Sequence, residues 1–254
     1  MSFSSSRRWF QPLTALLMSA GALSSASAQA VDPAVKNAAE ARPVLLELFT
    51  SQGCSSCPPA DAVLRELSGR SDVLALGFHV DYWDYLGWVD PFASPVFTAR
   101  QHGYAQRRGF QVYTPQLVID GQSAMVGSRR GQAEDEILSA ARRKLTAPAA
   151  ISREGQMVKL SLGKTAEAGA IGDIWLISFD RELATTIRSG ENGGKRIVYP
   201  NVVRSIRKLG DWSNEPLELN EILKSDERGE RLALVVQERG GRVWAVAATP
   251  ASAN

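Results

Sequence analysis

The two cysteines of the chain, Cys54 and Cys57, are three residues apart and could carry out redox chemistry. Thiols at this spacing can close a small disulfide, and a dithiol that opens and closes can exchange disulfides with a second molecule. The pair follows an apolar run at 44–49 and begins a segment with helical periodicity. A helix start presents free N–H groups and a positive dipole end, which favour a thiolate over a thiol. We therefore predict that Cys54, the outer residue nearer solvent, is the nucleophile and that Cys57 resolves the mixed disulfide.

The same cysteines have two other interpretations. They could form an inert structural disulfide, or they could bind a metal such as copper together with His79. His79 and His102 are the only histidines, and their spacing from the cysteines fits no compact zinc finger. The alternative is that neither histidine binds a metal, and that His79 is half-buried in a strand and His102 lies on the surface of a helix. Three functions therefore remain open: thiol–disulfide exchange without metal or cofactor, metal handling, and a noncatalytic binding module.

The apolar pattern around the cysteines predicts an α/β domain over residues 43–146. The runs at 44–49 and 73–80 are apolar throughout, as in strands that are buried on both faces. The segment between them has one apolar helix face, so the three elements predict a βαβ unit with parallel strands. That helix face consists of Ala60, Val63, Leu64 and Leu67, and we expect Pro58 and Pro59 in its first turn.

The rest of this domain is predicted as a helix, a hairpin and a last helix. Pro95 is expected to begin a helix over 95–108. The segments 116–119 and 123–126 flank Asp120-Gly121, a strong hairpin signal. The last helix is expected to bury Ile137, Leu138, Ala141 and Leu145.

Residues 151–250 are predicted to form a mostly antiparallel, sandwich-like β domain after a linker at 146–150. Strand patterns occupy 157–162, 174–179, 231–238 and 242–248. The segment 217–224 is the one stretch there that suggests a helix. The glycine-rich stretch 190–194 is predicted as a turn or loop between strands, because no helix with a Lys-Ser/Thr start follows it.

The first 30 residues have the pattern of a secretory signal peptide. Arg7 and Arg8 precede an apolar stretch that is too short to span a bilayer well, and small residues follow. The arginine pair also fits a twin-arginine export signal. We expect a periplasmic or secreted protein, where a disulfide persists, with no stable membrane insertion after cleavage and with residues 31–42 as a tether.

Charge limits the partners of the exported chain. The chain has 29 basic and 27 acidic residues, and the leader carries only Arg7 and Arg8, so 27 of each remain without it. A basic nucleic-acid surface is therefore not expected. The expected partner is a thiol or disulfide substrate, either a protein or a small molecule, together with a redox partner.

The strand–cysteines–helix arrangement resembles the thioredoxin superfamily over residues 42–146. The resemblance implies a buried acid in the preceding strand, at Glu47, that exchanges a proton with the resolving thiol. It also implies a cis proline facing the disulfide, at Pro115, with Thr114 contacting the substrate. Two departures concern the loop 50–53, which is one residue longer than usual, and the dipeptide 55–56, which lacks the proline or histidine of the best-known members.

Three longer motifs resemble a more specific group, the uncharacterised secreted thioredoxin-like family DUF1223. They are FTSQGCSSCPPAD at 49–61, HVDYWDYLGWVDPF at 79–92 and GENGGKRIVYPNVVR at 190–204. This resemblance covers nearly all of the exported chain and implies an appended β domain, with the glycine-rich loop touching the first domain. Tyr82 and Trp83 in the second motif are predicted to dock a partner beside the disulfide, the alternative being aromatic packing.

Overall fold

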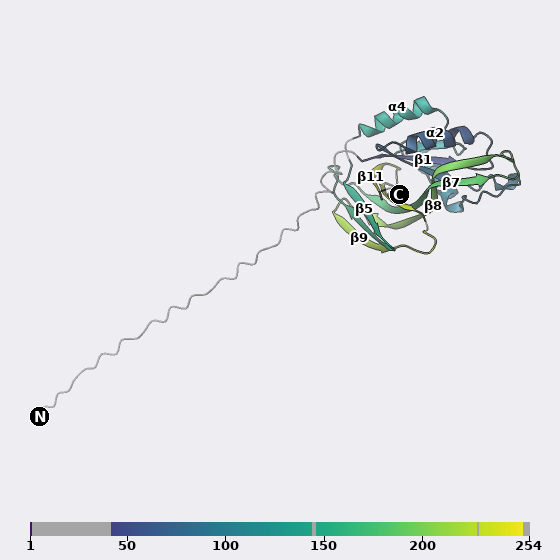
Figure 1. Cartoon of the computed structure of the whole chain (residues 1–254). Helices are drawn as coiled ribbons and strands as arrows, with labels where there is room; N and C mark the ends of the chain where they lie inside the picture. Colours follow the sequence, from purple (N-terminus) through teal and green to yellow (C-terminus); the bar gives the residue numbers. More distant parts are fainter. Residues whose placement is uncertain (2–41, 144–145, 228, 251–254) are drawn as a thin grey trace. The chain divides into compact units, whose positions relative to one another are not determined.

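The computed structural model describes Met1 and residues 42–143, 146–227 and 229–250. Nearly all of the predicted signal peptide and tether lies outside these residues (Figure 1). Among the described helices, none is long and apolar enough to cross a membrane.

In the first part of the chain, the helices and strands follow the predicted order. From Ala149 onward, the elements of the described residues are strands. The helices are α2 (Pro58–Ser68), the short 3-10 helix η1 (Asp84–Leu86), α3 (Pro95–Arg108) and α4 (Arg130–Ala141). The strands are β1 (Val44–Thr50), β2 (Val73–His79), β3 (Gln116–Ile119), β4 (Ser123–Val126), β5 (Ala149–Glu154), β6 (Met157–Leu162), β7 (Gly172–Thr186), β8 (Arg196–Trp212), β9 (Leu217–Ile222), β10 (Arg231–Gln237) and β11 (Val243–Ala248).

A mixed eight-stranded sheet has the strand order β11-β10-β7-β8-β2-β1-β3-β4. β1 and β2 pair in parallel with α2 between them in the chain, which confirms the βαβ unit. β2 also pairs in parallel with β8 at Gly77 and Val202, so strands from both predicted domains share this sheet. The start of the chain is consistent with a thioredoxin-like fold, while the division into two domains stays a prediction.

The two faces of β1 contact different helices, because successive side chains of a strand point to opposite sides. Leu46 and Leu48 pack with residues of α2 and α4, and both helices cover one face of the sheet (Figure 1). Leu45 and Phe49 pack on the other face, in a cluster that includes residues of α3. A functional side chain on β1 therefore belongs either to the α2 side or to the α3 side.

The C-terminal strands form the predicted sandwich-like layer. A second antiparallel sheet has the order β5-β6-β9. Val158 and Leu160 from this sheet pack with Leu176 of β7 and Leu234 of β10. The antiparallel prediction for this region is confirmed.

Three local predictions are wrong. The segment 217–224 is mostly strand β9 rather than helix, because its burial alternates residue by residue as a half-buried strand requires. The predicted linker 146–150 already contains the start of β5. On α4, the buried face is Ala133, Ile137 and Ala140, while Leu138 is 56% exposed; Leu145 lies outside the described residues.

Candidate active site

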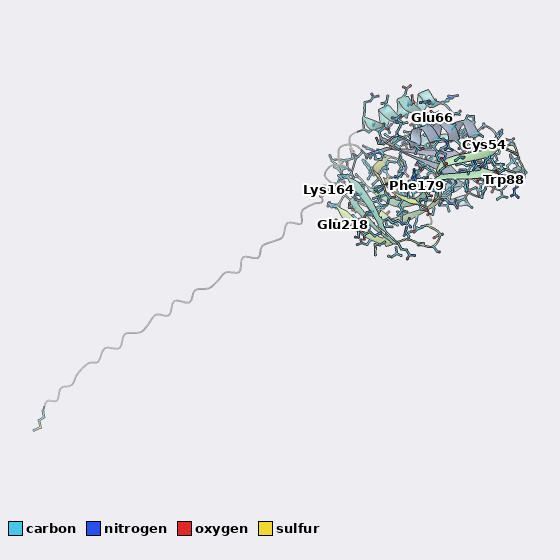
Figure 2. The ribbon with its side chains drawn as sticks, in the orientation of Figure 1. Cys54, Glu66, Trp88, Lys164, Phe179 and Glu218 are labelled. Atoms are coloured by element: carbon cyan, nitrogen blue, oxygen red, sulfur yellow. A yellow bond between two sulfur atoms is a disulfide. The ribbon has the colours of Figure 1, made fainter. Side chains whose placement is uncertain are left out.

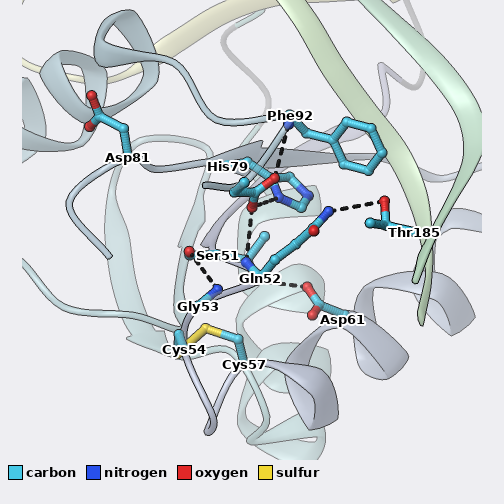
Figure 3. Close-up of polar contacts among 12 residues, drawn as sticks. Ser51, Gln52, Gly53, Cys54, Cys57, Asp61, His79, Asp81, Phe92 and Thr185 are labelled. Atoms are coloured by element: carbon cyan, nitrogen blue, oxygen red, sulfur yellow. Dashed lines mark hydrogen bonds and ion pairs between the residues drawn. A yellow bond between two sulfur atoms is a disulfide. The ribbon is translucent and has the colours of Figure 1, made fainter. Parts of the chain in front are cut away.

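The predicted disulfide is present between Cys54 and Cys57, with their Cα atoms 5.4 Å apart (Figure 3). Cys57 is the N-cap residue of α2, and Pro58 and Pro59 occupy the first turn as predicted. The two prolines lack N–H groups, which cost nothing at a helix start because those groups have no intrahelical acceptor there. The disulfide therefore lies at the N-terminal end of α2, directly after β1.

Both cysteines are buried, and the expectation that Cys54 lies nearer solvent than Cys57 stays a prediction. Cys54 is 1% exposed and Cys57 is 0% exposed, whereas Ser55 and Ser56 between them are exposed. The Sγ atom of Cys54 lies 3.4 Å from the Ser56 hydroxyl. A thiolate can therefore attack this disulfide only when a neighbouring segment moves and exposes the sulfur.

Asp61 lies one helical turn after Cys57, and residues four apart share a helix face. Its backbone N–H donates to the Cys57 carbonyl at 3.1 Å. Its Oδ1 accepts a 2.8 Å hydrogen bond from the Thr50 hydroxyl, while its buried Oδ2 has no hydrogen-bond partner among the described residues. Burial raises the pKa of Asp61 to about 7, against the opposing attraction of His79. This carboxyl can therefore gain or lose a proton near neutral pH.

His79 and Asp90 form a buried pair beside Asp61. The His79 Nδ1 atom lies 2.7 Å from Asp90 Oδ2. Burial lowers the pKa of His79, but the charges of Asp90 and Asp61 oppose it more strongly, so the pKa is raised overall. Burial likewise raises the pKa of Asp90, and His79 reverses this to leave it lowered. The expectation of a half-buried strand histidine is wrong, because the ring is enclosed and paired with a carboxylate.

The His79–Asp90 pair also holds the loop that precedes the cysteines. Asp90 Oδ2 accepts a 2.9 Å hydrogen bond from the Gln52 backbone N–H. The His79 ring meets the rings of Phe92 and Tyr199 edge to face, at centroid distances of 5.4 and 4.8 Å. Tyr199 belongs to β8, so the C-terminal part of the chain closes one side of this cluster.

Glu47, the acid predicted to assist the resolving thiol, lies on the other face of β1. It alternates with Leu46 and Leu48, which pack with α2, and it is fully buried. Its carboxylate accepts from Arg100 Nε at 2.5 Å and from the Tyr104 hydroxyl, both on α3. The structure thus brings Asp61, and not Glu47, to the helix that carries Cys57, and the proton-transfer role of Glu47 stays a prediction.

The Thr114–Pro115 peptide bond is cis, as the resemblance implied. The Trp83 indole N–H donates to the Thr114 hydroxyl at 2.7 Å. Trp83 also abuts Gly53, where an added Cβ would lie 3.0 Å from the Trp83 Cβ. The structure therefore brings Trp83, Thr114 and the residue before Cys54 together.

Tyr82 is half-buried and makes a 3.2 Å hydrogen bond to the Gln101 side chain. Tyr82 and Trp83 both pack against the core on the α3 side of the sheet. These contacts are the packing role that the sequence left as the alternative, and a role of either residue in substrate binding stays a prediction.

Metal handling also stays a prediction. His102 is exposed on α3, as expected. The Nδ1 atom of His79 is occupied by Asp90, while its buried Nε2 has no hydrogen-bond partner among the described residues. Within the same residues, no group of three or more His, Cys, Asp or Glu side chains is arranged to hold a metal ion.

The glycine-rich stretch 190–194 forms the connection between β7 and β8 and touches the loop around the cysteines, as predicted. The Asn192 side chain donates to the carbonyls of Gln52 and Cys54 at 2.9 and 2.8 Å. Cys54 and Trp88 lie at the same end of the structure, away from Lys164 and Glu218 of the small-sheet region (Figure 2).

A cavity of about 460 Å³ lies at the ends of β1 and β2 that are away from the disulfide. Arg42, Val73 and Leu74 are among the residues that line it.

Asp61, Asp90 and Asn192 are the site residues that sequence reasoning missed. A signal for Asp61 was available, because an acid four residues after Cys57 must share its helix face. Asp90 had no such signal, since it reaches the site from a loop distant in the chain, and for Asn192 the glycine-rich motif implied only that its loop touches the first domain.

Comparison with known proteins places this geometry in a defined group. Residues 45–237 match the model of a family described as "Protein of unknown function (DUF1223)". The crystal structure of protein AGR_C_4864 from Agrobacterium tumefaciens is 31% identical, covers 82% of this chain and 93% of its own, and has a TM-score of 0.69. HBP35 of Porphyromonas gingivalis is 11% identical over 84% of this chain and 78% of its own, with a TM-score of 0.56, which is a likeness of fold alone. A search of the curated proteins finds no match.

Proposed function

The chain belongs to the DUF1223 family, and we propose that it is a thiol–disulfide oxidoreductase with the Cys54–Cys57 pair as its redox centre. The observation that carries the proposal is the disulfide at the start of α2 with a buried carboxyl one turn away, the pKa of which is about 7. An inert disulfide has no use for such an acid, whereas a group that stores a proton near neutral pH assists thiol exchange. The parallel β1–β2 pair with α2 between its strands further supports a place in the thioredoxin superfamily.

The proposed exchange proceeds through one mixed disulfide. A substrate thiolate attacks the Cys54 sulfur, the Cys54–Cys57 bond breaks, and Cys57 leaves as a thiolate. A second thiolate of the same substrate then attacks the substrate sulfur that is bonded to Cys54. This forms the substrate disulfide and releases Cys54 as a thiolate. The substrate dithiol is thereby oxidised to a disulfide, the protein disulfide is reduced to two thiols, and the two substrate protons end on the cysteines. The reverse sequence reduces a substrate disulfide.

Asp61 is the proton carrier in this scheme. When Cys57 leaves, the protonated carboxyl of Asp61 gives it a proton, and in the reverse direction the carboxylate takes that proton before Cys57 attacks. A pKa of about 7 suits both directions, because each protonation state is populated near neutral pH. The ion pair of His79 and Asp90 places an imidazolium beside Asp61, which stabilises the carboxylate once the proton has left.

The proposed place of action is outside the cytosol. The leader pattern in residues 1–30 supports export, and a pair held as a disulfide suits an oxidising compartment. The redox partner in this proposal is a thiol–disulfide couple of that compartment.

Trapping of the mixed disulfide tests the proposal. Cys57→Ser leaves Cys54 free to attack oxidised glutathione, and without a resolving thiol the adduct should persist and appear as one added glutathione by mass. Cys54→Ser is the matched variant, and its Cys57, the predicted resolving thiol, should react at least tenfold more slowly. Equal, slow reaction of both variants would instead favour the noncatalytic alternative, which the burial of both cysteines supports.

A further inference from the structure

The connection between β7 and β8 lies against the loop that carries the disulfide. We call residues 187–195 the hairpin tip. The hairpin of β7 and β8 extends toward the end of the sheet where Cys54 lies (Figures 1 and 2). The tip is closed by its own backbone hydrogen bonds, from Ile187 N–H to Lys195 O at 2.9 Å and from Gly194 N–H to Ile187 O at 2.8 Å.

Asn192 makes the central contact of the hairpin tip. Its side-chain amide donates to the backbone carbonyls of Gln52 and Cys54, and the residue is 0% exposed. The Lys195 ammonium donates to the Asn192 Oδ1 atom at 2.8 Å. Because an ammonium can only donate, it fixes the amide with its NH₂ group toward the two carbonyls.

Two further contacts, from residues that precede Asn192, hold the tip. The Ser189 hydroxyl donates to the Gly87 carbonyl at 2.6 Å. The Glu191 carboxylate accepts a 3.1 Å hydrogen bond from the Ser55 backbone N–H. Hydrogen bonding to the side chain of Ser55, and then to its backbone, lowers the pKa of Glu191. The tip thus touches the residues before, at and after Cys54.

The hairpin tip is hydrogen-bonded to the loop in which the disulfide is enclosed. Exchange requires a thiolate to approach the Cys54 sulfur in line with the S–S bond, yet Cys54 is 1% exposed. Trp83 closes the loop from another direction through its contact with Gly53, and its indole is anchored on Thr114. Side-chain hydrogen bonds from Ser189, Glu191 and Asn192 attach the hairpin tip to the neighbouring loops, and contacts of this kind can open locally without unfolding the sheet.

We propose that the hairpin tip is a gate over the redox centre and that Asn192 is the positioning residue that holds it closed. The proposal rests on the proposed function, because a gate has a role only where the disulfide exchanges. When the tip lifts, water replaces the Asn192 amide at both carbonyls, and the Cys54 sulfur becomes accessible to a thiolate. Loss of two ordinary hydrogen bonds corresponds to about a 30-fold change in the opening equilibrium.

The rate at which a small reductant opens the disulfide measures this gate. The purified protein is mixed with excess dithiothreitol, quenched with an alkylating reagent and analysed by mass. Asn192→Ala should be reduced about 30-fold faster than the wild type, and Ser189→Ala, which loses one tip contact, about 5-fold faster. Asn220→Ala, an exposed asparagine on β9, is the matched control and should not differ from the wild type.

Dilute urea separates gating from loss of the fold. Reduction through local opening should depend weakly on urea, because little surface is exposed. Acceleration below twofold in Asn192→Ala would overturn the gate, as would acceleration that rises steeply with urea, which indicates global unfolding.

The gate and the proposed function fail in different ways. Unchanged rates in Asn192→Ala, together with reversible titration of the pair in glutathione buffers, would remove the gate and leave the oxidoreductase. Accelerated reduction of Asn192→Ala, together with a wild-type pair that does not titrate, would leave a covered disulfide and remove the oxidoreductase. Acceleration of the variant with a reversible wild-type titration supports both.

Discussion

Replacing Asp61 with asparagine should remove a pH dependence of stability that the wild-type protein carries between about pH 4 and pH 7. Burial raises the pKa of Asp61 from 3.8 to about 7, so the folded protein binds this proton more tightly than the unfolded chain. The free energy of unfolding therefore falls as the pH rises from about 4 to 7 and is constant above that range for this group. The difference in pKa corresponds to roughly 4 kcal/mol.

The neighbouring histidine changes stability in the same direction. A histidine with a raised pKa stabilises the folded state below its unfolded pKa, and this stabilisation is lost as the pH rises through its folded pKa. Because Asp61 contributes to the raised pKa of His79, Asp61→Asn removes that part as well. As the pH increases, the free energy of unfolding of the variant should therefore rise relative to that of the wild type. The titration of Asp61 itself contributes roughly 4 kcal/mol to this rise.

Urea unfolding of the oxidised protein from pH 4 to pH 8 measures this difference. The control is Glu66→Gln on the same helix, where the side chain is 53% exposed and pairs with Arg130 at the surface. Its difference from the wild type should stay within about 1 kcal/mol across the range. A difference between Asp61→Asn and the wild type that is equally flat would refute the assignment of a raised pKa to Asp61.

Three further predictions concern the site and its support. Asp61→Asn should slow resolution of the mixed disulfide roughly 100-fold at pH 7, as stopped-flow kinetics would show, because the proton carrier is lost; an unchanged rate would remove Asp61 from the mechanism. Arg100→Met should lower the free energy of unfolding by about 3–5 kcal/mol, because the buried carboxylate of Glu47 loses its cationic partner; a loss below 1 kcal/mol would show that this ion pair does not stabilise the fold. Gly53→Ala should cost about 1–3 kcal/mol in denaturant unfolding, because the new Cβ would lie 3.0 Å from Trp83 Cβ; wild-type stability would mean that the loop yields freely.

The sequence predicted those parts of the fold that local patterns determine. The boundaries of α3 and of the β3–β4 hairpin match the predicted segments, because Pro95 opens the helix and Asp120-Gly121 adopts the positive φ angles of a tight turn. The strands β5 and β9 were missed or assigned as helix because they are short and their apolar residues pack with residues of the eight-stranded sheet. No local pattern specifies that kind of pairing.

The site residues that lie in α2 or directly before it could be predicted from the sequence. Cys54, Cys57 and the two prolines follow from local sequence, and Asp61 could have been added from its spacing alone. Glu47 was assigned by resemblance, but the alternation of β1 places it toward Arg100 on the other face. The sequence motif around Asn192 indicated a contact, and only the long β7–β8 hairpin shows where that contact falls.

The most direct test of the central claim is the thiol–disulfide equilibrium of the purified protein in glutathione redox buffers, read by thiol trapping and mass. The account predicts a reversible two-electron titration of the Cys54–Cys57 pair, in which a tenfold change in the ratio of dithiol to disulfide takes about 30 mV. A pair that stays oxidised in every buffer would contradict the account and identify a structural disulfide.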